Sequence, residues 1–266
     1  MAATAVKGRA LVTGASGGIG LELARELARH GHPLVLSARS ADKLDALAAE
    51  LSAQHGVKAV AIPADLREPG GAERLAGALR EKDLDVDVLV NNAGVGMHGP
   101  FFAADPAAQV GLLQLNIVSL TALTRLLLPG MVARRAGRVL NLASTAAFVP
   151  GPFMATYYAS KAYVLSLSVA LANELAGSGV TVTALCPGAT RTGFDAAAGV
   201  TRTKLFKRGV MDAATVARAG YEGMMAGKVI VVPGVRNRLL AGSSGLAPRT
   251  FTARIARALH DPSDMG

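Results

Sequence analysis

The chain has 266 residues, which fits one large α/β domain, and residues 1–266 are expected to form it without a linker. Hydrophobic residues make up 51% of the chain and aromatic residues only 4%, a balance that suits a parallel sheet covered on both faces. The lone Cys186 excludes an internal disulfide, and the histidines lack the spacing of metal ligands, so no metal site is expected.

No secretory leader and no membrane span are expected, because the longest apolar stretch, 117–132, contains Arg125 and Pro129. With one cysteine, this predicts a cytoplasmic protein. The formal net charge is +9, and residues 187–266 carry 12 basic and 5 acidic side chains. This excess indicates an anionic substrate, carrier or surface, or else only a solvated face. No pattern indicates a nucleic-acid partner.

The segment 13–20, with the pattern Thr-Gly-x-x-x-Gly-x-Gly, lies between an apolar strand predicted at 9–12 and a helix with apolar residues at helical spacing. This context predicts a phosphate-binding loop, with an ordinary glycine-rich turn as the alternative. Gly14 allows a tight turn, Gly18 lets a pyrophosphate approach the backbone, and Gly20 lets the helix pack closely on the strand. The pattern therefore indicates a dinucleotide cofactor.

A second strand is predicted at 33–39 and ends where such folds bind the adenosine ribose. A site specific for NAD would have a carboxylate here, but this strand ends in Ala38 and Arg39. A guanidinium binds a 2′-phosphate in a forked geometry, and the hydroxyls of Ser16 and Ser40 could join it. The sequence thus predicts NADP rather than NAD, with a solvated strand-end arginine as the alternative.

Two further strands, predicted at 57–63 and 86–90, also end in polar or small residues. Asp65 follows the first of them and could accept a hydrogen bond from the adenine amino group, or cap the next helix. The second strand is followed by Asn-Asn-Ala-Gly at 91–94, which lets a cofactor approach the backbone closely. His98, in the loop after this motif, is either a catalytic or a structural histidine.

A long helix predicted at 107–135 is apolar on more than one face, so its second face must also be buried. Asn116 in its middle is unfavourable in a helix and should have a specific partner. A second long helix is predicted at 157–176. Together the two helices have more apolar surface than one sheet covers, which predicts a homodimer or a homotetramer.

The fifth strand, predicted at 138–143, ends at Ser144, and the helix that follows begins with Tyr157 and Lys161. The tyrosine and the lysine are four residues apart and therefore lie on one face of the helix. A tyrosine beside a cation is a residue type suited to proton transfer, and a serine hydroxyl can stabilise charge on an oxygen.

These motifs, in this order, resemble those of the short-chain dehydrogenases/reductases of the compact, single-domain type. The matching positions extend from residue 9 to about 192, and the last strand extends the match to about 234. The resemblance implies an α/β fold, a Rossmann-type doubly wound parallel sheet of about seven strands with helices on both faces. It also implies cofactor contacts from Gly14, Ser16, Gly18, Ile19, Gly20, Arg39, Ser40, Asp65, Leu66, Asn92, Ala93, Gly94, Tyr157, Lys161, Pro187, Gly188, Thr190 and Thr192.

The implied activity is hydride transfer between a nicotinamide and a carbonyl or alcohol, with a catalytic set of Asn116, Ser144, Tyr157 and Lys161. Tyr157 would give a proton to the substrate oxygen, or remove it in the oxidative direction. Lys161 and the oxidised nicotinamide would lower the pKa of Tyr157, and Lys161 would hold the nicotinamide ribose. Ser144 would hydrogen-bond the substrate oxygen, and Asn116 would hold a water that relays protons.

Strands predicted at 180–185 and 228–232 frame a substrate-loop region at about 189–225, and a C-terminal tail follows at about 236–266. In the family that the chain resembles, these two regions set the substrate. Basic residues are mixed with phenylalanine and leucine in 191–211. This mixture suits a lipophilic ketone, an aldehyde or a 3-oxoacyl thioester.

Within the tail, Phe251, Ile255 and Leu259 are each four residues apart and form an apolar stripe flanked by arginines. The pattern predicts a short amphipathic basic helix. This helix would dock on its own fold, form part of the pocket wall or a subunit contact, or bind an anionic membrane. The membrane alternative has the least support, because three large residues bury little area.

Two other classes of protein share such a fold. A catalytically silent nucleotide-sensing protein would be expected to lose Tyr157 or Lys161, and this chain has both. A sugar-nucleotide epimerase or dehydratase would have the tyrosine and lysine, but resembles Thr-Gly-x-x-Gly-x-x-Gly at the loop and usually has a larger C-terminal domain. Oxidation of NADPH with a panel of carbonyl compounds distinguishes these classes from a reductase.

Overall fold

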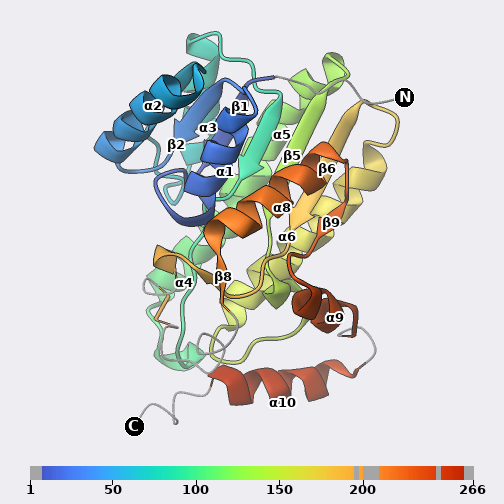
Figure 1. Cartoon of the computed structure of the whole chain (residues 1–266). Coiled ribbons are helices and arrows are strands. Elements are labelled where there is room, and N and C mark those ends of the chain that lie inside the picture. The colour runs from blue at the N-terminus through green and yellow to red at the C-terminus, as the bar shows by residue number, and fades with distance from the viewer. Residues whose placement is uncertain (1–7, 195–197, 200–209, 244–246, 261–266) are drawn as a thin grey trace.

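The computed structural model describes residues 8–194, 198–199, 210–243 and 247–260 (Figure 1). Within these residues, the centre is a parallel sheet of seven strands in the order β3-β2-β1-β4-β5-β6-β9. This confirms the predicted Rossmann-type fold. The strands are β1 (Ala10–Thr13), β2 (Leu34–Ser37), β3 (Ala59–Ala61), β4 (Val88–Asn91), β5 (Gly137–Leu142), β6 (Val180–Leu185) and β9 (Ile230–Val231).

Both faces of the sheet are buried, because each strand alternates its side chains between two helical layers. Ala10 and Val12 of β1 belong to the hydrophobic cluster on one face, whereas Leu11 belongs to the cluster on the other. The first layer comprises α1 (Gly18–Arg29), α2 (Ala41–His55) and α8 (Ala213–Met225). The second comprises α3 (Gly71–Glu81), α5 (Leu120–Ala133) and α6 (Ala155–Glu174).

Part of the region expected to be a substrate loop is instead core. Residues 213–225 form α8, and its Val216 and Met224 are buried in the same cluster as α1. The glycines and alanines of α8 weaken the apolar period, so the sequence pattern did not reveal this helix. They also let it approach the sheet closely, since a Cβ on Gly220 would lie 2.6 Å from Leu185 Cδ2.

The helix predicted at 107–135 is continuous but not regular. It consists of α4 (Pro106–Leu113), a π-helical turn η2 (Gln114–Ser119) and α5. By length and apolar composition this run could cross a membrane, and it is the one such helix in the described part of the chain. Its Leu123 and Met131 are buried in the cluster beneath the sheet, so it packs here as a core helix.

The carboxyl ends of the parallel strands meet at one edge of the sheet, where open α/β folds bind their ligands. The short elements gather beyond this edge, and Figure 1 shows α9 and α10 at the lower end of the molecule. These elements are η1 (Phe101–Ala103), η3 (Thr145–Phe148), the ladder of β7 (Thr190–Arg191) with β8 (Met211–Asp212), α9 (Val235–Ser243) and α10 (Arg249–His260).

Candidate active site

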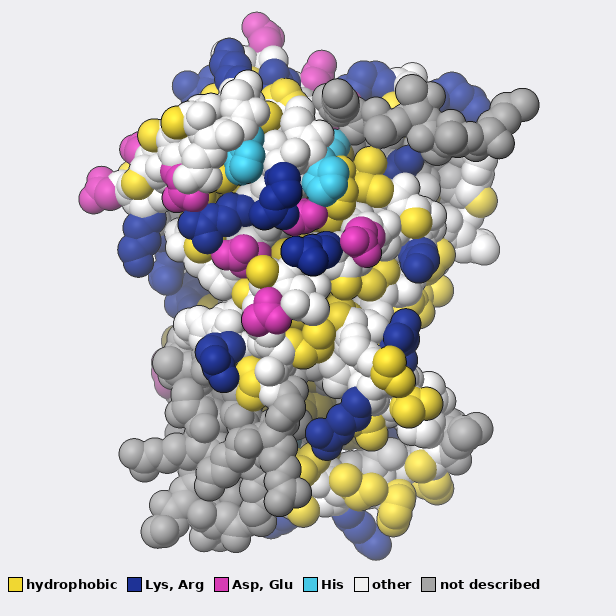
Figure 2. Space-filling model, viewed as in Figure 1, with side chains coloured by type: hydrophobic (Ala, Val, Ile, Leu, Met, Phe, Trp, Pro, Cys, Tyr) yellow, Lys and Arg dark blue, Asp and Glu magenta, His cyan; other side chains and the backbone are white. Residues whose placement is uncertain are grey.

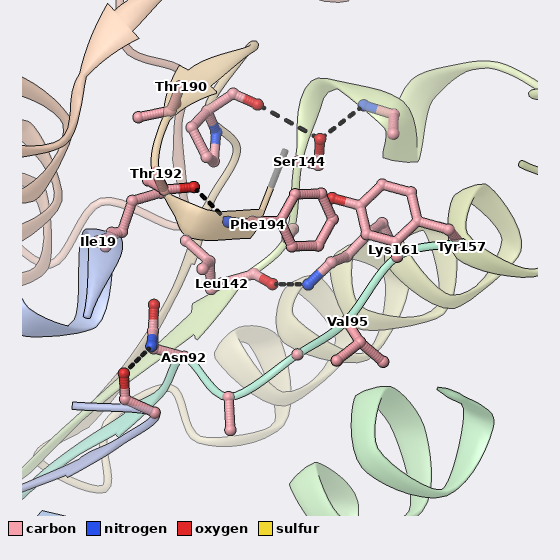
Figure 3. A pocket seen from close by; sticks show the side chains of 18 of the residues that line it. Ile19, Asn92, Val95, Leu142, Ser144, Tyr157, Lys161, Thr190, Thr192 and Phe194 are labelled. Carbon is pink, nitrogen blue, oxygen red and sulfur yellow. Dashed lines mark hydrogen bonds between the residues drawn. The ribbon is translucent and has the colours of Figure 1, made fainter. Parts of the chain in front are cut away.

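A pocket of about 500 Å³ lies at the carboxyl ends of β1, β4, β5 and β6. Its walls come from the glycine loop, the loop after β4, the end of β5, the start of α6 and the segment 187–194 after β6. Figure 3 shows Tyr157 and Lys161 pointing into this space from α6, with Ser144 and Phe194 close to the tyrosine. Segments far apart in the chain meet here because parallel strands end at the same edge.

The glycine loop has backbone conformations that side chains rarely adopt. Gly14 and Gly18 have φ angles of +67° and +57°, so a side chain at either position would be strained. A Cβ on Gly20 would collide with the Asn92 amide, and its absence lets α1 approach β1. Helix α1 begins after Gly17 without a side-chain cap, so the amides of its first turn are open to an anion.

The end of β4 braces this loop. Thr13 Oγ1 accepts hydrogen bonds from Asn92 N at 3.0 Å and from Ala93 N at 3.1 Å. Asn92 Nδ2 in turn donates to Thr13 O at 2.9 Å and to Gly14 O at 3.2 Å (Figure 3). The side chain of Asn92, which the sequence predicts to contact the cofactor, therefore also holds the loop that would bind the phosphates.

Small residues give the pocket the shape that a dinucleotide requires. A Cβ on Gly94 would lie 3.2 Å from Asn116 Oδ1 and 3.5 Å from Lys161 Nζ. A Cβ on Gly18 would lie 3.1 Å from Thr192 Cβ. The open start of α1 suits a pyrophosphate, and the polar groups beyond Gly94 suit a ribose. The residues present therefore fit a nicotinamide dinucleotide.

Two exposed arginines stand at the end of the pocket near β2 and β3. Arg39, which the sequence predicts, follows β2, and Arg67 joins it from the loop after β3. Neither side chain takes part in an ion pair among the described residues. Sequence reasoning missed Arg67, because it belongs to no motif and only the fold brings it beside Arg39.

Some predicted site residues do not line the pocket, namely Gly20, Ser40, Asp65, Leu66 and Asn116. Asp65 Oδ1 accepts a hydrogen bond from Arg67 N at 2.8 Å, which closes a local turn. It does not cap the next helix, because α3 begins after Gly70, so that alternative is wrong. Leu66 is buried, and its carbonyl accepts a hydrogen bond from Ser119 Oγ at 2.5 Å. Cofactor contacts from these residues stay predictions.

Ser144, Tyr157 and Lys161 form one cluster in the pocket wall. Ser144 follows β5, and its Oγ donates to Pro187 O at 3.4 Å. Lys161 Nζ donates to Leu142 O at 2.7 Å and lies 5.7 Å from the centre of the Tyr157 ring. The spacing along α6 thus places the tyrosine and the lysine together, and the end of β5 brings the serine to them.

Burial sets the protonation of this cluster. It raises the pKa of Tyr157 to about 12, a shift that the hydrogen bond with Ser144 only partly offsets. Burial also lowers the pKa of Lys161 to about 8. The lowered pKa expected for Tyr157 is therefore not found in the protein alone, because removal from water outweighs the hydrogen bond with Ser144. The Tyr157 hydroxyl is therefore protonated at neutral pH.

Asn116 has the specific partners that its place in a helix predicts. Its Oδ1 accepts a hydrogen bond from Val95 N at 3.0 Å, and its Nδ2 donates to Val95 O at 2.9 Å and to Ser160 Oγ at 3.0 Å. These bonds join the π-helical turn to the loop after β4 and to α6. Asn116 thereby fixes the loop carrying Gly94 against the helix carrying Lys161.

The other end of the pocket is aromatic. The Phe194 ring centre lies 5.4 Å from that of Tyr157, and Met154 and Tyr158 line the same wall. His260, the last residue of α10, also lines the pocket, and its Nε2 lies 2.6 Å from the Tyr158 hydroxyl. The tail therefore forms part of the pocket wall, one of the alternatives for it. The basic residues expected nearby, Arg202, Lys204, Lys207 and Arg208, lie outside the described residues.

Two other residues singled out in the sequence have structural partners. His98 Nε2 donates to the His260 carbonyl at 2.8 Å, and His98 does not line the pocket. Cys186 is buried at the end of β6, and burial raises the pKa of its thiol to about 12. A thiol with that pKa is neither a ready nucleophile nor a metal ligand.

Residues 8–202 match the family model described as short chain dehydrogenase, and the chain belongs to this family. A solved short-chain dehydrogenase from Sphingobium yanoikuyae in complex with NADPH is 37% identical, with a TM-score of 0.81 over 90% of this chain and 94% of that one. The bulky-bulky ketone specific alcohol dehydrogenase from Comamonas testosteroni is 32% identical, with a TM-score of 0.77 over 91% and 94%.

A curated relative is the very-long-chain 3-oxoacyl-CoA reductase of Pyrenophora tritici-repentis, 37% identical over 179 residues. The match covers 65% of this chain and 52% of that protein, so the chain spans about half the length of this relative. The family model and these relatives place the chain among the short-chain dehydrogenases, a family of oxidoreductases.

Proposed function

We propose that the protein reduces the carbonyl group of a lipophilic ketone, aldehyde or 3-oxoacyl thioester with NADPH. The observation that carries the proposal is the position of Ser144, Tyr157 and Lys161 between the glycine-lined part of the pocket and its aromatic end. A cofactor held by the glycines and an apolar substrate held by the aromatic end would meet beside the Tyr157 hydroxyl.

The preference for NADP is supported by charge. Arg39 after β2 and Arg67 after β3 are exposed at one end of the pocket, and no carboxylate follows β2 before Ser40. A 2′-phosphate would find two cationic side chains there, whereas positions 38 and 39 lack the carboxylate that would bind the ribose hydroxyls of NAD. The NADPH bound by the Sphingobium relative agrees with this preference.

A bound nicotinamide would supply the hydride, and side chains of the protein would supply the proton. Tyr157, neutral because its pKa is raised to about 12, donates its proton to the carbonyl oxygen as negative charge develops there. Ser144 hydrogen-bonds the same oxygen and stabilises that charge. Lys161, cationic below its pKa of about 8, stabilises the tyrosinate that remains. Asn116 holds the loop after β4 against α6 and thereby positions Lys161. It would also hold a water that relays protons.

The lipophilic character of the substrate is supported by Phe194, Met154 and Tyr158 around the far end of the pocket. Segment 187–194 and the end of α10 would then set substrate specificity, together with the part of the loop beyond Phe194. One relative is named as a 3-oxoacyl-CoA reductase and another as specific for bulky ketones, so both substrate types belong in the test.

The test is the oxidation of NADPH by the purified protein with a panel of ketones, aldehydes and 3-oxoacyl thioesters of increasing chain length. We expect turnover with at least one of these classes and a rising kcat/KM with apolar size. Binding of NADPH without oxidation by any member of the panel would contradict the proposal and would favour a nucleotide-sensing protein.

We also propose that the protein is a homodimer or homotetramer. The helical run of α4, η2 and α5 leaves Val110 and Val118 65% and 48% exposed, and Val169 on α6 is 41% exposed. Packing these surfaces against a second copy would remove them from water. Light scattering that gives only the mass of one chain, 27.1 kDa, at micromolar concentration would contradict this assembly.

A further inference from the structure

Helix α10 presents its apolar stripe to solvent. Phe251, Ile255 and Leu259 are 55%, 51% and 38% exposed. The buried residues of this helix are instead Ala256 and His260, which lie on another side of it. The helix therefore docks on its own fold through Ala256 and His260, and its apolar stripe is left uncovered.

Helix α9 extends the same exposed apolar surface. None of its residues is buried, and Val235, Leu239 and Leu240 are 64%, 70% and 59% exposed. Figure 2 shows hydrophobic side chains gathered over α9 and α10 at the lower end of the molecule, with basic side chains among them. The tail face comprises these exposed residues: Val235, Arg236, Arg238, Leu239, Leu240, Arg249, Phe251, Arg254, Ile255 and Leu259.

The tail face carries positive charge and no negative charge. It has four arginines, all exposed, and the sequence contains no aspartate or glutamate from residue 223 to residue 260. Exposed apolar side chains next to arginines are the composition of helices that lie in the boundary between water and lipid. Arginines that served only to keep the protein in solution would not need large exposed apolar residues beside them.

The opposite side of α10 is fastened to the rigid part of the protein. His260 Nε2 lies 2.6 Å from the Tyr158 hydroxyl, and the His260 carbonyl accepts a hydrogen bond from His98 Nε2 at 2.8 Å. The Arg257 guanidinium lies 5.4 Å from the centre of the Phe153 ring. These contacts hold the helix against the pocket wall and keep its apolar stripe directed outward.

We propose that the tail face docks the protein on the surface of an anionic lipid membrane. The apolar side chains would enter the headgroup boundary, and the arginines would pair with lipid phosphates. A second copy of this chain is the other occupant that such a face could take. A two-fold contact, however, would bring the arginines of one copy against those of the other. An anionic membrane removes that repulsion, and charge complementarity therefore selects it.

The docking does not depend on the proposed reaction, and its test needs no enzyme activity. The chain has no tryptophan, so Phe251→Trp places a single fluorescent reporter on the tail face. Vesicles of phosphatidylglycerol with phosphatidylcholine should shift its emission to the blue, and vesicles of phosphatidylcholine alone should not. About 1 M salt should reverse the shift, because it shortens the Debye length to about 3 Å and so weakens the attraction between the arginines and the lipid phosphates. The matched reporter Tyr163→Trp, on α6, should not respond.

Flotation of the full chain with the same vesicles tests how much individual tail-face residues contribute to membrane binding. Ile255→Ser combined with Leu259→Ser should lower the partition coefficient at least about tenfold, because the apolar contribution is lost. Arg249→Gln combined with Arg254→Gln should lower it by a similar factor on anionic vesicles.

Matched changes away from the tail face are the controls. Val229→Ser combined with Ile230→Ser removes apolar residues that are 39% and 42% exposed and lie outside the proposed subunit contact, and Arg80→Gln combined with Arg218→Gln removes exposed charge. Both control variants should bind vesicles as the wild type does, and every variant should keep its melting temperature.

Three results would overturn the proposal. The first is that the wild-type chain does not bind anionic vesicles. The second is that the tail-face variants and the control variants lose binding equally. The third is that a tail-face variant reduces the mass seen by light scattering, which would assign the face to a second copy of the chain.

Discussion

The glycine-loop helix α1 and the C-terminal helix α10 both border the pocket, but they use their apolar residues in opposite ways. Leu23 and Leu27 of α1 are fully buried against the sheet, whereas Phe251 and Ile255 of α10 are more than half exposed. Both helices show apolar residues at helical spacing. The comparison teaches that such a stripe indicates a helix, whereas its burial depends on whether a face of the sheet is still uncovered.

The two regions also differ in how they are held. The end of β4 fixes the backbone of the glycine loop through hydrogen bonds that Asn92 and Ala93 donate to Thr13 and Gly14. Helix α10 is fastened mainly through His260 and Arg257 near its carboxyl end. We therefore expect changes at the cofactor end to affect catalysis and folding strongly, and changes on the tail face to affect them little.

The largest expected effect is on catalysis at the cofactor end. Tyr157→Phe removes the proposed proton donor and should lower kcat by about 100- to 10,000-fold, with NADPH binding nearly unchanged. The control is Tyr163→Phe, which loses a hydroxyl that bonds Thr121 on the surface and should keep full turnover. Turnover of Tyr157→Phe within about tenfold of the wild type would contradict the assignment.

The next effect compares the two helices directly. Leu23→Ala in α1 should lower the free energy of unfolding by about 2–5 kcal/mol, because it empties a fully buried site. Phe251→Ala in α10 should change it by no more than about 0.5 kcal/mol, since the ring is 55% exposed. Denaturant titration measures both. A large loss for Phe251→Ala would show that the stripe is buried in solution.

A smaller effect concerns cofactor choice. Arg39→Ala should raise the dissociation constant for NADPH about 10- to 100-fold, the loss of one or more charged hydrogen bonds, and should leave that for NADH nearly unchanged. Fluorescence titration with both cofactors measures this, with Arg80→Ala as an exposed-charge control. Equal affinity of the wild type for NADH and NADPH would remove the basis for the prediction.

The smallest effect is a pH dependence of the α10 contact. Burial and repulsion from His98 lower the pKa of His260 to about 4, below its ordinary value of 6.5. His260 binds a proton more readily when the tail is unfolded than when α10 is docked. The docked state is therefore fully stabilised above pH 6.5, and this stabilisation is lost as the pH falls toward 4. From pH 7 to pH 5.5 the loss should be about 1 kcal/mol.

Hydrogen exchange of the α10 amides follows this loss, after correction for the intrinsic pH dependence of exchange. Among the residues that the structure describes, His98 and the Tyr158 hydroxyl are the titratable groups that face His260. His260→Gln should be insensitive to pH in this range. Equal pH dependence in wild type and variant would contradict the assignment to His260.

The sequence by itself determined the fold class, the family and the order of the site motifs, because these depend on local patterns. The pattern of segment 13–20 requires glycine where φ is positive, and Tyr157 and Lys161 share a face because they are one helical turn apart. It also predicted that Asn116 has a specific partner, since an asparagine in an apolar helix needs one. The roles proposed for these residues stay predictions until the variants are measured.

Only the tertiary structure decided which distant groups meet. Arg67 and His260 enter the pocket from segments without a motif. Asn91 Nδ2 on β4 donates to Thr124 Oγ1 on α5 and to Asn141 Oδ1 on β5, at 2.9 Å each. The direction of the Tyr157 pKa is also tertiary, because it depends on how much water the surrounding elements exclude. The tertiary structure also decided which face of α10 points outward, because the helix packs through Ala256 and His260 and leaves its apolar stripe uncovered.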